Sequence, residues 1–148
     1  MWASKVADGV RDDMPLVYLI QIETPFGARR YVGKAKTKTQ KRLRKDYQAN
    51  IKRIFEGKQK RGDGPYTKAG NPQKRSNIEY RYVHLLLAVA VQEDWPITHT
   101  AIENVPRDDL KRREDQLIHE LNADLNDKPM WPVERFADLK AKVVAGIE

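Results

Sequence analysis

The chain has 148 residues and no cysteine, which excludes disulfide bonds and cysteine-ligated zinc. Its 28 Lys and Arg residues outnumber its 21 Asp and Glu residues, and the cations concentrate between Arg29 and Arg81, so the expected partner is a polyanion, nucleic acid before an anionic membrane. No apolar run approaches the roughly 20 residues of a membrane span, and residues 1–13 lack the apolar core of a signal peptide. We therefore expect one cytoplasmic domain, residues 1–148, with no membrane association.

The N-terminal part of the sequence predicts a β-hairpin after a weakly structured lead-in at residues 1–15. Residues 16–23 are rich in Val, Tyr, Leu and Ile and run into Thr-Pro-Phe-Gly at 24–27, which predicts a strand that enters a turn. Residues 29–33 predict the return strand, across a loop longer than the minimum. Gly33 is expected to end that strand where the backbone must turn closely.

A basic helix is predicted next, over residues 40–57, with Gly57 as its C-terminal stop. Spacings of four, four and three form one apolar stripe from Leu43, Tyr47, Ile51 and Ile54. Residues 57–76 then hold four glycines, two prolines and six Lys or Arg residues. This composition is too polar to pack, so it predicts a basic, flexible loop.

The C-terminal half predicts three helices and one strand. Asn77 is placed to cap a helix over residues 78–93, which has a wide apolar face and should be the best-buried helix. Residues 97–105 predict a third strand, 107–125 a further helix, and 132–145 an extra C-terminal helix. The expected fold class is α+β, with a small, mostly antiparallel three-stranded sheet flanked by helices.

A carboxylate within an apolar stripe is the most unusual feature of the sequence. On a helical wheel of about 100° per residue, an arc of roughly 80° contains Leu110, Leu117, Ile118, Leu121 and Leu125. Glu114 falls in the middle of that arc. Burying a carboxylate is costly unless it is paired, protonated or bound to a cation. Three explanations stay open: an ion pair with an arginine, a place at the shallow end of the stripe, or a metal-binding role.

A five-part arrangement now becomes visible along the chain. It consists of Val17-Tyr18, Tyr31-Val32-Gly33, Arg42, Glu114 and Asn126. Their order and spacing resemble the GIY-YIG nuclease superfamily, and the segment YVGKAK at 31–36 is close to the form in the nuclease domain of the excision-repair protein UvrC. The matching positions run over residues 16–126. The family commonly has His or Tyr four positions after the arginine, where this chain has Asp46, with Tyr47 beside it.

The resemblance implies a DNA endonuclease that uses Mg²⁺, with Mn²⁺ as a substitute, and leaves 5′-phosphate and 3′-hydroxyl ends. Glu114 would be the carboxylate ligand of the metal, and Arg42 would hold the scissile phosphate. Tyr31 is expected to be the general base, with Tyr18 positioning the water or the metal shell, although the reverse assignment stays open. Lys34 would supply positive charge that favours the phenolate. Asn126 would cap the helix end and hold the loop that backs Glu114.

Other cations are expected to contact the backbone of double-stranded DNA without reading its sequence. They are Lys36, Lys38, Lys41, Arg44, Lys45, Lys58, Lys60, Arg61, Lys68, Lys74 and Arg75. Cutting both strands would need a homodimer or two successive nicks, because one such site holds one strand at a time. The alternative is a catalytically degenerate nucleic-acid-binding module, which Asp46 favours.

Overall fold

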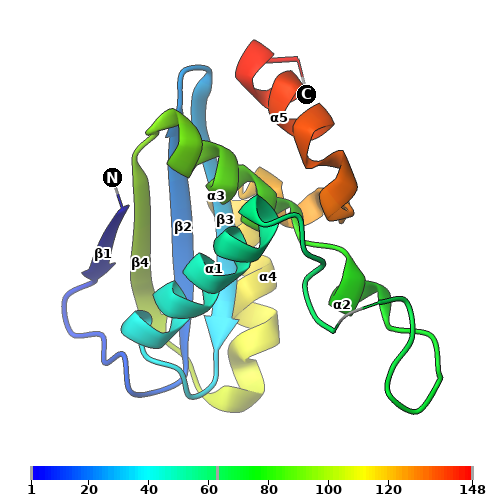
Figure 1. Ribbon diagram of the computed structural model, residues 1–148. Helices are drawn as coiled ribbons and strands as arrows, with labels where there is room; N and C mark the ends of the chain where they lie inside the picture. Colours follow the sequence, from blue (N-terminus) through cyan, green and yellow to red (C-terminus); the bar gives the residue numbers. More distant parts are fainter. Residues whose placement is uncertain (1, 63, 148) are drawn as a thin grey trace.

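The chain folds as a four-stranded sheet with helices on both faces (Figure 1). The computed structural model describes residues 2–62 and 64–147, so Met1, Asp63 and Glu148 lie outside the description. The strands are β1 (Trp2–Val6), β2 (Leu16–Thr24), β3 (Gly27–Ala35) and β4 (Ile97–Asn104). Their spatial order is β1-β4-β2-β3, with β1 parallel to β4 and the other pairs antiparallel. The predicted α+β class is confirmed.

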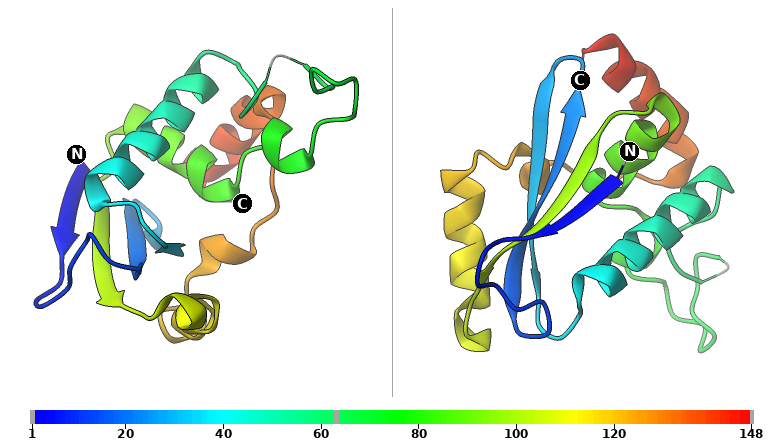
Figure 2. Two further views of the ribbon diagram at one scale, coloured as in Figure 1. Left: turned by 90° about the horizontal axis from the view of Figure 1, so that it is seen from below. Right: turned by 90° about the vertical axis from the view of Figure 1, so that its left-hand side faces the viewer.

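Two helical layers enclose the sheet. The helices are α1 (Gln40–Phe55), α2 (Arg75–Ile78), α3 (Tyr82–Glu93), α4 (Leu110–Glu120) and α5 (Phe136–Ala145), with 3₁₀ turns η1 (Arg107–Asp109), η2 (Asp124–Asp127) and η3 (Val133–Arg135). Figure 2 shows α1 and α3 on one face of the sheet and α4 on the other. Each face therefore has its own apolar cluster, the larger one under α1 and α3. None of the helices in residues 2–62 and 64–147 is long and apolar enough to cross a membrane.

The strand β1 corrects two predictions, the weakly structured lead-in and the three-stranded sheet. β1 pairs with β4 from Trp2 opposite Ile97 to Val6 opposite Ala101. The strand is short, lies at an edge and is only partly buried, so it has no alternating apolar pattern to reveal it. Side chains of α1 hold it in place, since the amide of Gln40 donates to the Lys5 carbonyl at 2.8 Å.

The hairpin is tighter and longer than the sequence predicts. Thr24 pairs with Gly27, so the loop has only two residues, 25–26, and the prediction of a longer loop was wrong. Gly27 has a φ of 124°, which favours glycine at the end of this turn. The return strand continues to Ala35, so Gly33 lies inside β3 and does not end it. Pairing with β2 along the whole length of β3 outweighs the weak strand preference of glycine.

The helix α1 agrees with its prediction, whereas the three other predicted helices begin later. The helix predicted over 132–145 starts at Phe136, after the 3₁₀ turn η3. The stripe of α1 is buried as expected. The helix predicted over 78–93 begins only at Tyr82, and Asn77 lies in α2, where its side-chain amide bonds Gln73 at 3.1 Å and caps nothing. The helix predicted over 107–125 starts with a 3₁₀ turn and ends at Glu120, because Asn122 adopts a left-handed φ of 51° and turns the chain into η2.

The predicted basic loop contains a short hairpin of its own. Tyr66 bridges to Pro72, the Gln73 amide donates to the Pro65 carbonyl at 2.8 Å, and the Thr67 amide donates to the Asn71 carbonyl at 2.7 Å. Figure 1 shows this segment projecting away from the sheet near α2. Local hydrogen bonds of this kind depend on turn geometry and leave little trace in composition.

Two histidines are buried in the larger core. Burial lowers the pKa of His84 to about 3, with the positive charges of Lys60 and Arg81 adding to the effect. Burial, and then the charge of Arg44, lower the pKa of His99 to about 4. Both ring nitrogens of His99 find no hydrogen-bond partner among the described residues. Each histidine is therefore neutral in the folded chain near pH 7.

Acidification from pH 7 to pH 5 should destabilise the fold through these histidines. Their folded pKa values lie below the unfolded value of about 6.5, so stability is present above pH 6.5 and is lost as the pH falls toward 4. For His99 the loss between pH 7 and pH 5 is about 2 kcal/mol. Urea unfolding of His99→Gln should show a pH dependence smaller by this amount. His119→Gln, which changes an exposed histidine, should keep the wild-type dependence; the same dependence in both variants would contradict the assignment.

Candidate active site

The strand β3 carries the centre of the candidate site and is the outermost strand on its side of the sheet. Side chains alternate along it, so Tyr31 belongs to the core under α1 and α3, whereas Val32 belongs to the core under α4. A pocket of about 470 Å³ reaches around this edge and is lined by Tyr31, Lys34, Glu114 and Asn126. Four residues expected at the site are thereby brought together from both faces of the sheet.

Glu114 is buried on α4, with only 8% of its surface exposed. Its neighbours on the stripe, Leu110 and Leu117, are also buried, which excludes the shallow end of the stripe as the explanation. The Lys34 Nζ lies 3.3 Å from Oε1 and 3.5 Å from Oε2 of Glu114, and the Lys111 Nζ lies 3.8 Å from Oε1. The ion pair considered from the sequence therefore exists, but with lysine and not with arginine.

Tyr31 meets an arginine that the sequence reasoning missed. Nη1 of Arg81 donates to the Tyr31 hydroxyl at 2.9 Å. Arg81 is the N-cap residue of α3, and every residue from Tyr82 to Ala90 that follows it is buried. In the sequence, Arg81 could have been noticed as a cation directly before a helix that has no polar face. It was missed because the helix was expected to start at residue 78, which placed Arg81 in its interior.

Asn126 closes the exposed edge of β3 and belongs to η2. Its side-chain oxygen accepts from the Val32 amide at 2.9 Å, and its side-chain nitrogen donates to the Val32 carbonyl at 2.7 Å. This side chain therefore pairs with the strand edge as a neighbouring strand would. The expected role of holding the loop beside Glu114 agrees with this contact, although α4 has already ended at Glu120.

Tyr18 lies on β2 directly opposite Gly33, and the two residues are in very close contact. A Cβ at position 33 would lie 2.2 Å from Cζ of the Tyr18 ring, so only glycine leaves room for it. The Tyr18 hydroxyl is 2.8 Å from the hydroxyl of Tyr47 on α1, and either oxygen can be the donor. Burial raises the pKa of both phenols well above the usual range, so both are neutral.

A second pocket, of about 560 Å³, lies on the α1 side of the site. We call it the basic pocket, and it is lined by Tyr18, Lys38, Arg42, Leu43, Asp46, Tyr47, Ala49, Asn50, Lys60, Arg61, Arg81 and His84. Asp46 lies 2.6 Å from the Lys38 Nζ and 3.4 Å from the Arg42 Nε. Tyr18 and Arg42 are therefore separated from the pocket that contains Glu114. Arg81 lines both pockets and connects them.

The pocket of Glu114 contains oxygen atoms of the kind that bind magnesium. Asp115 and Asp127 line the same pocket and add carboxylate oxygens, which are the ligands that Mg²⁺ prefers, whereas the Asn126 side-chain oxygen already accepts from the Val32 amide. No three His, Asp or Glu side chains within residues 2–62 and 64–147 are grouped so that they could hold a metal by themselves. A magnesium site here would therefore depend on Glu114 together with water and substrate oxygens, as Mg²⁺ sites commonly do.

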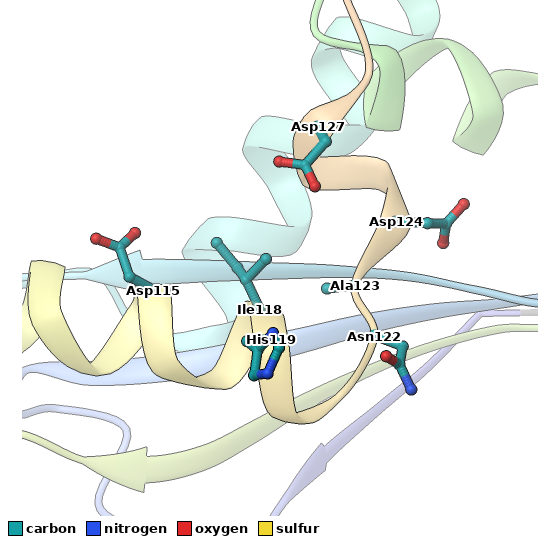
Figure 3. Close-up of a pocket in the computed structure, with 7 residues that line it drawn as sticks. All are labelled: Asp115, Ile118, His119, Asn122, Ala123, Asp124 and Asp127. Carbon is teal, nitrogen blue, oxygen red and sulfur yellow. The ribbon is translucent and has the colours of Figure 1, made fainter.

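An acidic pocket of about 350 Å³ lies next to this site, at the step from α4 to η2 (Figure 3). Ile118 lies between Asp115 and Asp127, and the Asp124 side chain points away from both. The Asp124 carboxylate accepts a 2.6 Å bond from the Arg29 Nε, so it serves to fasten η2 to β3. We assign no separate role to this pocket.

The remaining cations named from the sequence spread over the surface. Seven exposed ones line neither the basic pocket nor the pocket of Glu114: Lys36, Lys41, Lys45, Lys58, Lys68, Lys74 and Arg75. Three of the expected DNA contacts, Lys38, Lys60 and Arg61, line the basic pocket. Arg44 instead serves the fold, since it donates to the Trp2 carbonyl at 3.0 Å and lies over the Trp2 ring at 5.6 Å.

No protein-family model, curated protein or solved structure matches this chain. The resemblance to GIY-YIG nucleases therefore depends on the residues and the geometry described above. Its consequences for activity are a matter for proposal and experiment.

Replacing Gly33 by alanine should displace the Tyr18 ring and destabilise the fold by about 1–3 kcal/mol, because the new methyl group overlaps that ring. Urea unfolding would measure this loss. Gly64→Ala is the matched control, because a Cβ there meets nothing within 4 Å. Equal stability of the two variants would show that the contact between Tyr18 and Gly33 is not tight.

Proposed function

We propose that this protein is a metal-dependent endonuclease of the GIY-YIG type that hydrolyses phosphodiester bonds in DNA. The observation that supports this most strongly is the meeting of Tyr31, Lys34 and Glu114 in one pocket, although Lys34 and Glu114 are 80 positions apart. The basic character of the chain, with a net charge of +7, suits a DNA substrate. The products would carry 5′-phosphate and 3′-hydroxyl ends.

Glu114 would hold Mg²⁺ or Mn²⁺ in this proposal, with Asn126 keeping the adjacent η2 turn against β3. A bound divalent ion would neutralise charge on the phosphate and increase the acidity of its water. In the structure, the Lys34 Nζ lies 3.3 and 3.5 Å from the two carboxylate oxygens of Glu114. Its flexible side chain could turn from Glu114 to a phosphate oxygen when substrate binds.

Tyr31 is the better of the two tyrosines for the role of general base. Its hydroxyl accepts a hydrogen bond from Arg81, and that cation would stabilise a negative charge on the phenol oxygen. Tyr18 differs in its partner, because its hydroxyl bonds the neutral hydroxyl of Tyr47 and burial raises its pKa, which favours the neutral phenol. We assign Tyr18 to positioning, through its bond to Tyr47, and Tyr31 to the removal of a proton from the attacking water.

Two arginines are available to bind phosphate oxygens in the proposed reaction. Arg42 lies in the basic pocket, and Arg81 lies between the two pockets beside Tyr31. Guanidinium groups suit this task because they form bidentate, charge-assisted hydrogen bonds. We infer that Arg81 binds near the reacting phosphate and that Arg42 acts from the side of α1.

A second candidate function is a nucleic-acid-binding module without nuclease activity. Asp46 supports it, because this carboxylate contacts both Lys38 and Arg42 where the family commonly has His or Tyr. Arg42 would then be an element of a surface ion pair. Tyr47 weakens this alternative, since its hydroxyl already bonds Tyr18 from the position next to Asp46.

Incubation of the protein with supercoiled plasmid and Mg²⁺ should give nicked or linear DNA. Glu114→Ala should lower the rate at least about 100-fold, a loss typical of removing a group that stabilises transition-state charge. Gel electrophoresis measures the products. Glu120→Ala removes an exposed carboxylate from the end of the same helix and should cut at the wild-type rate. If wild type and Glu114→Ala give identical products, the metal-site proposal fails.

Tyr31→Phe should slow cutting by about 100- to 10 000-fold, the range for losing a general base, while leaving DNA affinity nearly unchanged. Tyr18→Phe should reduce the rate less, because it loses a positioning bond and no base. Rate measurements over a pH series would separate the two roles. Equal rates for Tyr31→Phe and wild type would exclude Tyr31 as the base.

A further inference from the structure

Among the residues that the structure describes, the lining of the basic pocket contains more positive charge than one carboxylate can balance. Its cations are Lys38, Arg42, Lys60, Arg61 and Arg81, against one carboxylate, Asp46. Asp46 contacts Lys38 and Arg42. No carboxylate within residues 2–62 and 64–147 forms an ion pair with the remaining three cations. The pocket therefore has the charge of an anion site.

Lys60 shows the effect of this imbalance. Its side chain is partly buried at the pocket wall, and its pKa is lowered by burial first and then by the positive charges of Arg81 and Arg61. Like charges held together in this way repel one another, so a bound anion would relieve the repulsion.

The paired phenols supply a neutral donor to the same pocket. Tyr18 and Tyr47 share one hydrogen bond between their hydroxyl oxygens, although each carries a hydroxyl proton. One of the two protons is used in that bond, and the other can be donated to a ligand. Both phenols remain protonated because burial raises their pKa. Three cations and one hydroxyl donor match the oxygens of a phosphate group.

We propose that the basic pocket binds the backbone phosphate next to the scissile phosphate of the same DNA strand. Because Arg81 lines both pockets, a strand whose scissile phosphate lies beside Tyr31 would bring a neighbouring phosphate toward Lys60 and Arg61. This inference rests on the proposed nuclease function for the identity of the strand. The presence of an anion site rests on the pocket alone.

Titration of the protein with inorganic phosphate in EDTA, followed by NMR, tests the anion site without any metal. Lys60→Met keeps the aliphatic stem and removes the charge, and Arg61→Ala changes an exposed side chain. Each should raise the dissociation constant for phosphate at least fivefold. Lys52→Met, which removes an exposed charge of α1 outside the pocket, should leave it unchanged. A phosphate affinity that is the same in all four proteins would overturn the proposal.

Binding of a 20-base-pair duplex to the Glu114→Ala protein tests whether the ligand is a backbone or a terminal phosphate. Duplexes with 5′-hydroxyl and 5′-phosphate ends should bind equally well, and Lys60→Met should weaken both. A preference for the 5′-phosphate that disappears with Lys60→Met would overturn the backbone assignment.

The two proposals fail separately. If Glu114→Ala nicks plasmid like the wild type but phosphate binding depends on Lys60, only the nuclease proposal fails. If nicking depends on Glu114 but the affinity for phosphate is the same with and without Lys60, only the anion site is excluded.

Discussion

The position of β3 at the edge of the sheet is the constraint on which the candidate site depends. Successive side chains of a strand point to opposite faces, so Tyr31 and Lys34 would be separated by the sheet if another strand followed. At an edge, a pocket can reach around the strand and contain both. Asn126 satisfies the Val32 backbone at this edge without covering it with a full strand. The site thus stays open while the strand remains ordered.

The burial of Glu114 shows how a charged group can be retained in an apolar layer. Removing a carboxylate from water carries a large desolvation penalty, which one lysine contact compensates only in part. The Lys34 side chain lies close to both oxygens of Glu114 and is about one-third exposed, so its ammonium group can move away from Glu114 into solvent. Such a pair is a poor device for stability. Under the proposed function, Glu114 would exchange this lysine for a metal ion, and a pair of this kind suits such an exchange.

Arg81 links two pockets that differ in chemistry. The pocket of Glu114 is lined by carboxylates and lysines, whereas the described lining of the basic pocket has more cations than carboxylates, together with two neutral phenols. Gly33 makes this division possible, because the Tyr18 ring can reach Tyr47 only by lying over a residue without a Cβ. Gly33 therefore allows the phenols of Tyr47 on α1 and Tyr18 on β2 to meet in the basic pocket, while Tyr31 lines the pocket of Glu114.

The sequence by itself determined the α+β class, the apolar stripe of α1 and the place of Glu114 on the apolar stripe of its helix, because these follow from the order of the elements and from periodicities within one element. The tertiary structure decided the rest. β1 is stabilised by pairing with β4, in which each residue lies 95 positions from its partner, and the start of α3 determines whether Arg81 faces Tyr31 or lies inside a helix. The partner of Glu114 and the separation of Arg42 from it also depend on contacts between distant segments. Local patterns cannot contain such information, since the interactions arise only when the chain packs.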